Sequence, residues 1–359
     1  MSEEIKNLQE ELNDQMQIRR DKLAEYEADG IYPFGQRFVV KDHAKDIKND
    51  FLNYEDQPVV IAGRLMTMRS HGKTAFANIR DLSGDIQVYF RKDVLGEDNY
   101  KYVKMLDIGD IVGIEGHVFR THSGEVTIKV DKLTLLSKAL RPLPEKWHGL
   151  KDTELRYRQR YVDLIVNPEV RDTFIKRSKI VAKIREYMMN DGFMEVETPM
   201  MHPIPGGAAA RPFITHHNAL DIDIYMRIAP ELYLKRLIVG GMERVFEMNR
   251  CFRNEGIDNR HNPEFTTIES YQAYGDVEDA IRLTENLVSY CAQEVLGTQE
   301  ITYQGTEINL TPPWNRITMA EGVKKYTGED FDAVTTVEEA RAIADRLNVE
   351  YTDNDGIGK

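Results

Sequence analysis

The sequence predicts an α+β protein with two structural parts. Short alternating strands separated by turns fill residues 57–137, which is typical of a small β-barrel. Beyond a proline-marked linker, helical periodicity and strand alternation are mixed, which favours an antiparallel sheet flanked by helices over a doubly wound sheet. A length of 359 residues suits two or three domains. We expect an N-terminal helix and lead-in at 1–56, the barrel at 57–140, a linker at 141–155 and the mixed domain at 156–359.

The first thirty residues are predicted to form a helix. Apolar residues recur there at steps of three or four, and Gly30 followed by Pro33 ends the run. These apolar residues are Ile5, Leu8, Leu12, Met16, Leu23 and Tyr26. Arg19, Arg20 and Lys22 cluster on the same helix, and the cluster fits a solvated face and a phosphate contact equally well.

Five short strands are expected between residues 57 and 137. Turn residues such as Ser83-Gly84 and Ser123-Gly124 lie between some of them. The strands are expected at 59–64, 74–80, 85–91, 110–118 and 125–135. Five strands in about eighty residues are typical of a closed barrel such as the oligonucleotide-binding fold.

One outer face of this barrel is a candidate RNA-binding surface. On the strand 74–80 the alternation puts Ala75 and Ala77 inside and Phe76 outside, and on 85–91 it leaves Gln87 outside. From residue 64 to residue 80 there are four Lys or Arg residues and no acidic residue. A basic face with an exposed aromatic side chain fits single-stranded RNA. The alternative is an ordinary, partly buried surface phenylalanine.

The second part is predicted to alternate helices with strands. Gly192 ends the first helix, and Pro230 opens a short one that Gly240-Gly241 closes. The expected elements are a helix over 170–190, a strand over 222–228, a helix over 230–239, two strands within 244–272 and a helix over 276–296.

The two strands within 244–272 carry the candidate site. If they pair, the period of two puts one set of side chains on a single face, with Arg260 and His261 at its rim. That set is Arg253, Glu255, Phe265, Glu269 and Tyr271. A guanidinium can hold a carboxylate and a phosphate, an aromatic ring can stack on a base, and buried carboxylates can receive an ammonium group. These are the requirements of a site that joins an amino acid to a nucleotide. A surface hairpin of salt-bridged polar residues is the alternative.

Several classes of protein are excluded by composition and motifs. A net charge of −13 argues against a general nucleic-acid coat protein, although it allows a local basic face. No apolar run approaches the roughly 18 residues of a membrane helix, so we expect no membrane association. Two distant cysteines, Cys251 and Cys291, exclude a disulfide framework and indicate a reducing compartment. Neither G-x-x-x-x-G-K-[ST] nor G-x-G-x-x-G is present, so ATP would have to bind on the sheet.

Motifs across the whole chain resemble the class II aminoacyl-tRNA synthetases, and among these the bacterial lysyl-tRNA synthetases. The segment 192–199 is similar to the first class II signature, which builds the dimer interface. Phe252-Arg253-Asn254-Glu255 with 261–265 is similar to the second, which clamps ATP and the amino acid. Further similar segments are 30–34, 144–150, 205–213, 227–236 and Glu269-Ser270-Tyr271.

The resemblance implies a function and a set of site residues. The implied enzyme is a cytoplasmic, homodimeric lysine–tRNA ligase that uses ATP and Mg²⁺ to form lysyl-adenylate and transfers lysine to the 3′ end of tRNA(Lys). Arg253 would be catalytic, because it would bridge the lysine carboxylate and the α-phosphate. The implied ATP ligands are Arg253, Glu255, His261, Asn262 and Phe265, with Phe265 stacking on adenine. The implied lysine ligands are Gly207, Glu231, Arg253, Glu269 and Tyr271. Phe76 and Gln87 would read the anticodon.

The sequence departs from the family in one respect. We do not find the third class II signature, and we expect the Mg²⁺ ligands and a further lysine-binding glutamate past Lys359, so no metal site is expected within this chain. The resemblance therefore implies a class II domain that is incomplete at its C-terminus, poorly stable after Arg156 and unable to form lysyl-adenylate. The alternatives are a catalytically inactive RNA-binding fragment and a paralogue that lysylates a protein, although the barrel argues against the latter.

Overall fold

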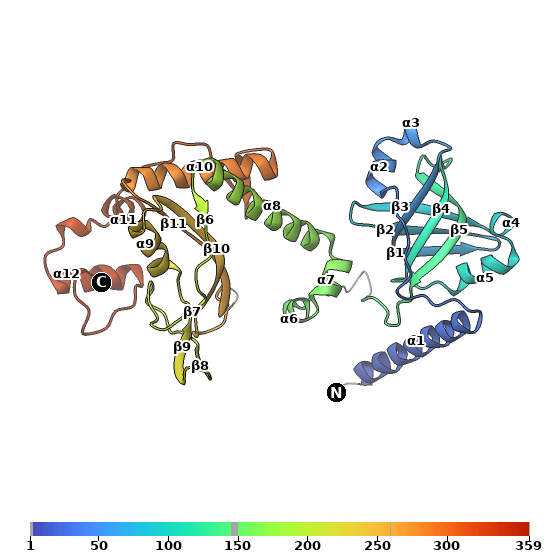
Figure 1. Cartoon of the computed structure of the whole chain (residues 1–359), viewed down its shortest axis with the longest axis horizontal. Coiled ribbons are helices and arrows are strands. Elements are labelled where there is room, and N and C mark those ends of the chain that lie inside the picture. The colour runs from blue at the N-terminus through green and yellow to red at the C-terminus, as the bar shows by residue number, and fades with distance from the viewer. Residues whose placement is uncertain (1–2, 145–149, 259, 359) are drawn as a thin grey trace. The chain divides into compact units, whose positions relative to one another are not determined.

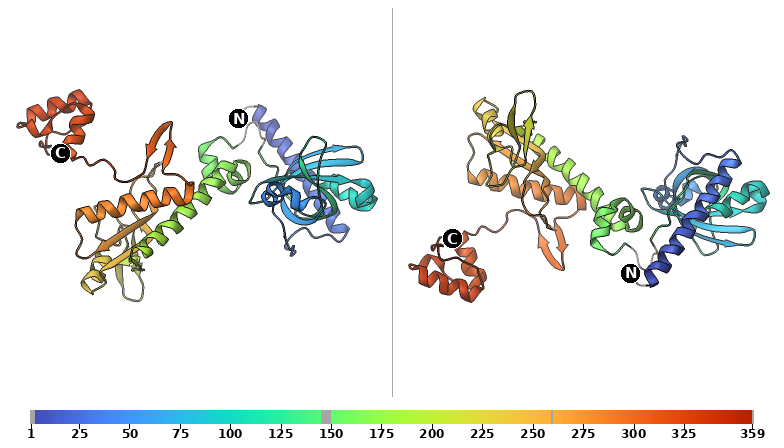
Figure 2. Two further views of the ribbon diagram at one scale, coloured as in Figure 1. Left: turned by 90° about the horizontal axis from the view of Figure 1, so that it is seen from above. Right: turned by 90° about the horizontal axis from the view of Figure 1, so that it is seen from below.

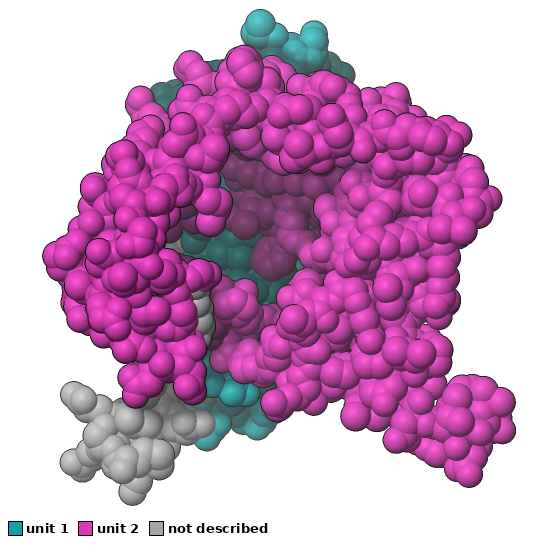
Figure 3. Space-filling model, turned by 90° about the vertical axis from the view of Figure 1, so that its left-hand side faces the viewer, with its two compact units in different colours: residues 1–170 teal, residues 171–359 magenta. Residues whose placement is uncertain are grey.

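The computed structural model describes residues 3–144, 150–258 and 260–358, and it confirms the α+β fold (Figure 1). The chain divides into two compact units, residues 1–170 and 171–359, which are coloured separately in Figure 3. Residues 145–149 of the similar segment 144–150 lie outside the described residues, as do the side chains of Ile5, Leu8 and Leu12. Among the helices that the structure describes, none has the length and apolar character needed to cross a membrane.

Unit 1 contains the predicted five-stranded closed barrel, with the strand order β1-β2-β3-β5-β4. All neighbours pair antiparallel except β3 and β5, which pair parallel. The strands are β1 (Pro58–His71), β2 (Thr74–Arg80), β3 (Asp85–Arg91), β4 (Ile111–Arg120) and β5 (Val126–Ser137). The first strand is longer than predicted because its register shifts between Leu65 and Thr67. This irregularity lets one strand pair with β4 over 58–64 and with β2 over 64–71.

The barrel core follows the predicted alternation. Ala75, Ala77 and Ile79 of β2 are buried, whereas Phe76 between them is exposed. On β3 the buried side chains are Ile86, Val88 and Phe90. The inner faces of the strands therefore fill the barrel, and the outer face of β2 and β3 remains open to solvent.

Helix α1 (Glu3–Ala28) is fastened to the barrel by the basic cluster that the sequence shows on it. The Arg19 side chain is buried, and its Nη1 atom donates to three backbone carbonyls, those of Ile108 (3.2 Å), Ala139 (2.9 Å) and Arg141 (3.3 Å). Lys22 forms an ion pair with Asp107 at 2.7 Å, and Arg20 is exposed. Arg19 and Lys22 are therefore neither a solvated face nor a phosphate site, because both are already engaged with the protein.

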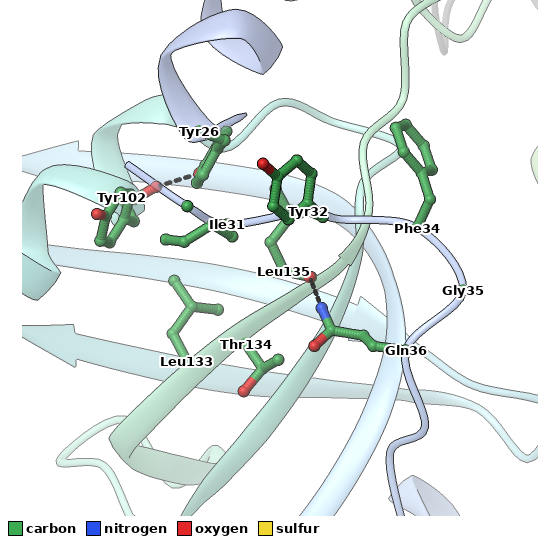
Figure 4. A pocket seen from close by; sticks show the side chains of 11 residues that line it. Tyr26, Ile31, Tyr32, Phe34, Gly35, Gln36, Tyr102, Leu133, Thr134 and Leu135 are labelled. Carbon is green, nitrogen blue, oxygen red and sulfur yellow. Dashed lines mark hydrogen bonds between the residues drawn. The ribbon is translucent and has the colours of Figure 1, made fainter. Parts of the chain in front are cut away.

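A pocket of about 630 Å³ lies beside the segment that leads from α1 into the barrel (Figure 4). The hydroxyl of Tyr26 donates to the carbonyl of Tyr102 at 3.0 Å, and Gln36 Nε2 donates to the carbonyl of Leu135 at 2.7 Å. The first bond holds the end of α1 against α5 (Glu97–Met105), and the second holds the lead-in segment against β5. None of the predicted site residues lines this pocket.

Short helices complete unit 1. They are α2 (Ala44–Asn49), α3 (Phe51–Tyr54), α4 (Lys92–Leu95), α5 (Glu97–Met105), α6 (Thr153–Arg158) and α7 (Arg160–Val166). The carboxylate of Asp163 in α7 is buried and accepts hydrogen bonds from Arg156 (2.9 Å) and Asn167 (2.6 Å). These bonds tie α6 and α7 together just before the long helix α8 (Pro168–Asn190).

Unit 2 holds the predicted two-stranded ladder at its centre. Strands β10 (Arg244–Phe252) and β11 (Glu264–Gln272) pair antiparallel along their whole length, and the short β6 (Met194–Glu195) adds a parallel edge to β10. Helices α8 and α10 (Val277–Leu296) run side by side in both views of Figure 2, and Lys183 lies 2.9 Å from Glu294 between them. Met188, Phe193 and Phe246 form the buried core under this ladder.

A second small sheet in unit 2 has the order β7-β9-β8. Its strands are β7 (Met201–His202), β8 (Ile214–His217) and β9 (Ile222–Met226), and α9 (Glu231–Val239) follows. The predicted strand over 222–228 ends at Met226 because Arg227 leaves the ladder and bonds to other segments. The elements after α10 are β12 (Glu300–Tyr303), β13 (Thr306–Asn309), α11 (Met319–Thr327), η1 (Phe331–Ala333) and α12 (Val337–Leu347), none of which we predicted.

Candidate functional site

Arg253 lies immediately after β10 and packs on the ring of Phe265. Its backbone N–H donates to the carbonyl of Pro263 at 2.8 Å, and its guanidinium carbon lies 5.1 Å from the centroid of the Phe265 ring. A guanidinium over an aromatic face is held by a cation–π interaction. The Nε atom is buried without a hydrogen-bond partner, and no carboxylate of the described residues forms an ion pair with Arg253. Its charge is therefore available to an anionic ligand.

The residues predicted to hold ATP line one pocket of about 240 Å³ around this guanidinium. The lining residues are Arg253, Glu255, Gly256, Arg260, His261, Asn262 and Phe265. The antiparallel register produces this grouping, because Cys251 lies opposite Phe265 and the chain reverses just beyond that pair. The structure thus brings together all five predicted ATP ligands, and the role of each remains a prediction.

Asp258 organises the loop between β10 and β11, and the sequence analysis missed it. Its Oδ1 atom accepts the backbone N–H groups of Arg260 (2.6 Å) and His261 (2.7 Å), and its Oδ2 atom lies 2.7 Å from His261 Nδ1. The bond from Arg260, followed by those from His261, holds the pKa of the Asp258 carboxyl below its usual value. An aspartate that accepts the N–H two residues later is a known turn signal, so the residue could have been found from sequence.

The segment 205–213 is hydrogen-bonded to the residues that directly follow β10. The N–H of Asn254 donates to the carbonyl of Arg211 at 2.7 Å, and the N–H of Arg211 lies 3.3 Å from Glu255 Oε1. Glu255 is otherwise exposed at the rim of the pocket. These contacts bring a second similar segment to the edge of the nucleotide pocket, although Arg211 itself was not predicted.

The predicted lysine ligands Glu269 and Tyr271 contact each other on β11. The Tyr271 hydroxyl donates to Glu269 Oε2 at 3.3 Å. Burial raises the pKa of Glu269, and the neighbouring carboxylates of Glu231 and Glu247 act in the same direction. Burial also raises the pKa of Tyr271. Carboxylates gathered in a partly buried place create a negative potential that suits an ammonium group.

Gly207 and Glu231 form a second contact in this region. Gly207 has φ = +88°, and a Cβ atom built on it would lie 2.9 Å from the Cβ of Glu231. Glu231 begins α9, where its carboxylate lies 2.5 Å from Lys235 Nζ. The two predicted ligands of the α-ammonium group are therefore neighbours, and only glycine fits at position 207.

A row of aromatic side chains lies on the candidate RNA-binding face of the barrel. The ring of Phe76, which is 36% exposed, stacks on that of Tyr89 with centroids 4.3 Å apart and an interplanar angle of 18°. Phe119 of β4 continues the row, with its centroid 6.2 Å from that of Tyr89. Thr127 donates its hydroxyl to Gln87 Oε1 at 2.8 Å, which directs the amide nitrogen of Gln87 away from Thr127. One ring face and one amide are thus presented side by side.

Comparison with known proteins agrees with both halves of this description. A family model described as tRNA synthetases class II (D, K and N) matches residues 152–353, and one described as OB-fold nucleic acid binding domain matches residues 59–136. A protein of Thermoanaerobacter pseudethanolicus named Lysine--tRNA ligase is 59% identical over 350 residues, which are 97% of this chain and 70% of that protein.

Two further relatives carry the same name. The protein from Carboxydothermus hydrogenoformans is 57% identical, over 98% of this chain and 72% of its own length, and that from Bacillus subtilis is 55% identical, over 100% and 73%. The class II match spans more than half of the chain, and the chain covers more than two thirds of each of these relatives. On this evidence the chain belongs to the class II tRNA synthetases of the D, K and N group, with an OB-fold nucleic acid binding domain before the synthetase domain.

Proposed function

We propose that this protein is a lysine–tRNA ligase, which activates lysine with ATP and transfers it to the 3′ end of tRNA(Lys). The observation that carries the proposal is one sheet face with two kinds of ligand group. Arg253 lies over Phe265 in the nucleotide pocket, and Glu269 with Tyr271 lies further along the same strand. The names of the relatives support the choice of lysine.

The first step joins two anions. The lysine carboxylate attacks the α-phosphate in line, a P–O bond to the carboxylate oxygen forms, and the bond to the leaving pyrophosphate breaks. Arg253 would contact both anions and offset their repulsion, because its guanidinium has no competing carboxylate among the described residues. Positioning and charge neutralisation carry chemistry of this kind, so no protein nucleophile is required. His261, already bonded to Asp258, would contact phosphate and would not act as a base.

Selectivity for lysine would come from charge pairing. Glu231 beside Gly207 would meet the α-ammonium group, and Glu269 with Tyr271 would line the side-chain pocket. An apolar analogue would enter this pocket and leave a carboxylate without a partner. Stranding a buried charge costs about 3–5 kcal/mol, which is a factor of hundreds or more in binding.

The second substrate would be recognised on the barrel. A base of the anticodon would stack on the open face of Phe76, and the amide of Gln87 would bond to a base edge. The stacked Tyr89 supports the ring of Phe76 from behind, so little side-chain freedom is lost on binding.

Mg²⁺, which the family resemblance implies, has no ligand set among the residues that the structure describes. No group of three or more His, Cys, Asp or Glu side chains within 3–144, 150–258 and 260–358 could hold a metal ion. The described residues therefore do not fit a resident metal ion. Both cysteines are buried and free, which suits the cytoplasm that we propose as the location.

Ligand binding by the 359-residue chain tests the proposal. By isothermal titration calorimetry, we expect L-lysine to bind at least about a hundredfold more tightly than L-norleucine, which lacks the ε-ammonium group. Arg253→Ala should abolish binding of a non-hydrolysable ATP analogue, whereas Arg236→Ala, on the exposed side of α9, should not change it. Equal affinity for the two amino acids would contradict the lysine assignment. A chain that binds anticodon-hairpin RNA but neither lysine nor the ATP analogue would favour the alternative, an RNA-binding protein without adenylation.

A further inference from the structure

Arg227 and Glu247 form a nearly completely buried ion pair in unit 2. Their side chains are 0% and 1% exposed, and Arg227 Nη1 lies 2.7 Å from Glu247 Oε1. The other carboxylate oxygen, Oε2, accepts the hydroxyl of Thr198 at 2.6 Å. Arg227 Nε donates to the carbonyl of Arg250 at 2.8 Å, whereas Nη2 is buried and has no hydrogen-bond partner. A buried ion pair is weak evidence for a stabilising role, because desolvation offsets most of its attraction.

The position of the pair relates it to the proposed lysine pocket. Glu247 lies directly opposite Glu269 in the β10–β11 ladder, so both side chains are on the same face of the sheet. Side chains opposed in this way have Cβ atoms roughly 4.5–5.5 Å apart, and like charges there repel each other. Without Arg227, the charge of Glu247 would oppose ionisation of Glu269.

Arg227 also connects the two three-stranded sheets of unit 2 through its backbone. Its N–H donates to the carbonyl of Met200 at 2.8 Å, and its carbonyl accepts the N–H of Phe252 at 2.9 Å. Phe252 precedes Arg253. Arg227 therefore contacts the residue that precedes Arg253, the proposed catalytic residue, and also carries the charge that neutralises Glu247.

We infer that Arg227 and Glu247 are positioning residues for the amino-acid pocket, in which Arg227 cancels the charge of Glu247 so that Glu269 stays an ionised ligand for the substrate ammonium group. This inference deepens the proposed function and rests on it for the identity of the ligand. Neither residue was among the predicted ligands, and neither is expected to touch lysine or ATP.

The charged groups around Glu269 determine in which direction each substitution should shift its pKa. Titratable and charged groups that face it are Tyr271 on β11, Glu247 and Cys251 on β10, Arg227 after β9, and Glu231 with its partner Lys235 on α9. Burial is the main cause that raises the pKa of Glu269, the charges of Glu231 and Glu247 add to it, and that of Arg227 opposes it. Loss of Arg227 should therefore raise this pKa, and loss of the charge on Glu247 should lower it.

The direct test is to follow the carboxyl of Glu269 by NMR in protein with ¹³C at the glutamate Cδ, with Glu269→Gln to assign the signal. We expect Arg227→Met to raise the pKa of Glu269, Glu247→Gln to lower it, and the double variant to return it close to the wild-type value. Arg236→Met, which removes an exposed cation from α9, is the matched control and should leave it unchanged. General loosening of the fold would admit water and lower the pKa in every variant, so a rise in Arg227→Met separates charge from packing.

Two further comparisons make each outcome decisive. If Arg227→Met does not fold, the double variant must still show a higher pKa of Glu269 than Glu247→Gln, since only Arg227 differs between them. An unchanged pKa in folded variants would overturn the inference. Lysine affinity separates this from the proposed function: Arg227→Met should bind lysine more weakly than the wild type at acidic pH, where its Glu269 is protonated first, and recover as the pH rises. A further outcome is a wild type that binds no lysine while the pKa of Glu269 changes in the variants as expected. That result would contradict the lysine assignment but support the role of Arg227 and Glu247 in setting the charge of Glu269.

Discussion

The side chains of Phe76 and Gln87 are preorganised for ligand binding in the free protein. Phe76 rests on Tyr89, so one face of its ring is covered and the other is open. Gln87 has its oxygen bonded to Thr127, which settles the amide orientation. Both side chains have lost part of their freedom in the free protein, and that loss does not have to be repeated on binding.

Replacing Phe76 by Ala should weaken binding of an anticodon stem-loop by about 1–3 kcal/mol, because one stacking platform is lost. The matched control is Phe34→Ala, which removes another exposed phenylalanine of unit 1, at the pocket of Figure 4. Fluorescence anisotropy at fixed salt measures both. Equal affinity of the Phe76 variant and the wild type would remove the anticodon assignment.

Gly207→Ala should weaken lysine binding through Glu231. A methyl group at this position has to displace the Glu231 side chain, whose Cβ would be 2.9 Å away, and the positive φ adds strain. Gly241→Ala is the control, because Gly241 has φ = +92° but open space around it. We expect the lysine dissociation constant to rise by about tenfold or more for Gly207→Ala relative to the control, as measured by calorimetry. Similar effects of both substitutions would show that backbone strain alone is responsible.

At the level of elements, the order of the loop between β10 and β11 depends on the carboxylate of Asp258. The lowered pKa of Asp258 means that its ordering effect is fully present above the ordinary value of 3.8 and is lost as pH falls through the lowered one. We therefore expect the NMR amide signals of Arg260 and His261 to shift together once the pH falls below about 4.

The substitutions Asp258→Asn and Asp258→Ala separate the two parts of this role. Asparagine can still accept the N–H groups of Arg260 and His261, but it has no charge to offer the imidazole of His261. We expect Asp258→Asn to keep the loop ordered without the acid transition, and Asp258→Ala to lose affinity for an ATP analogue at neutral pH. A loop that is equally ordered in Asp258→Ala would contradict this role.

The elements differ in how far the sequence specifies them. Alternation along residues 244–272 predicts which side chains share a face, because side-chain direction in a strand is a local property. The observed register confirms this for Phe265, Glu269 and Tyr271, whereas Arg253 and Glu255 lie past the end of β10. The Arg227–Glu247 pair joins segments 20 residues apart, and no local pattern says that an arginine at a strand end will turn inward. Helices α11 and α12 were missed although Thr318 and Thr336 each begin a capping box, a signal that single-sequence analysis can use.

At the scale of the whole molecule, we propose a homodimer built on the first class II signature. Met189 at the end of α8 and Met194 on β6 are each 54% exposed, and such apolar surface favours a partner. Sedimentation equilibrium at micromolar concentration should give twice the 41.5 kDa of one chain. Met194→Glu should shift the protein towards the monomer, whereas Met319→Glu, at the 88% exposed start of α11, should not. A single 41.5 kDa species in the wild type would contradict the homodimer.

The anchoring of α1 by Arg19 has a consequence for the order in which the protein acquires its shape during synthesis. The helix is made before the barrel, and the three carbonyls that Arg19 needs belong to residues 89, 120 and 122 positions later. At about 5–20 residues per second, a ribosome takes several seconds or more to supply them. During that interval the helix has neither its anchor nor the barrel surface that covers Tyr26, and it can take its final place only when the last barrel strand has been translated. A helix that is translated before the barrel is thus among the last parts of unit 1 to become fixed.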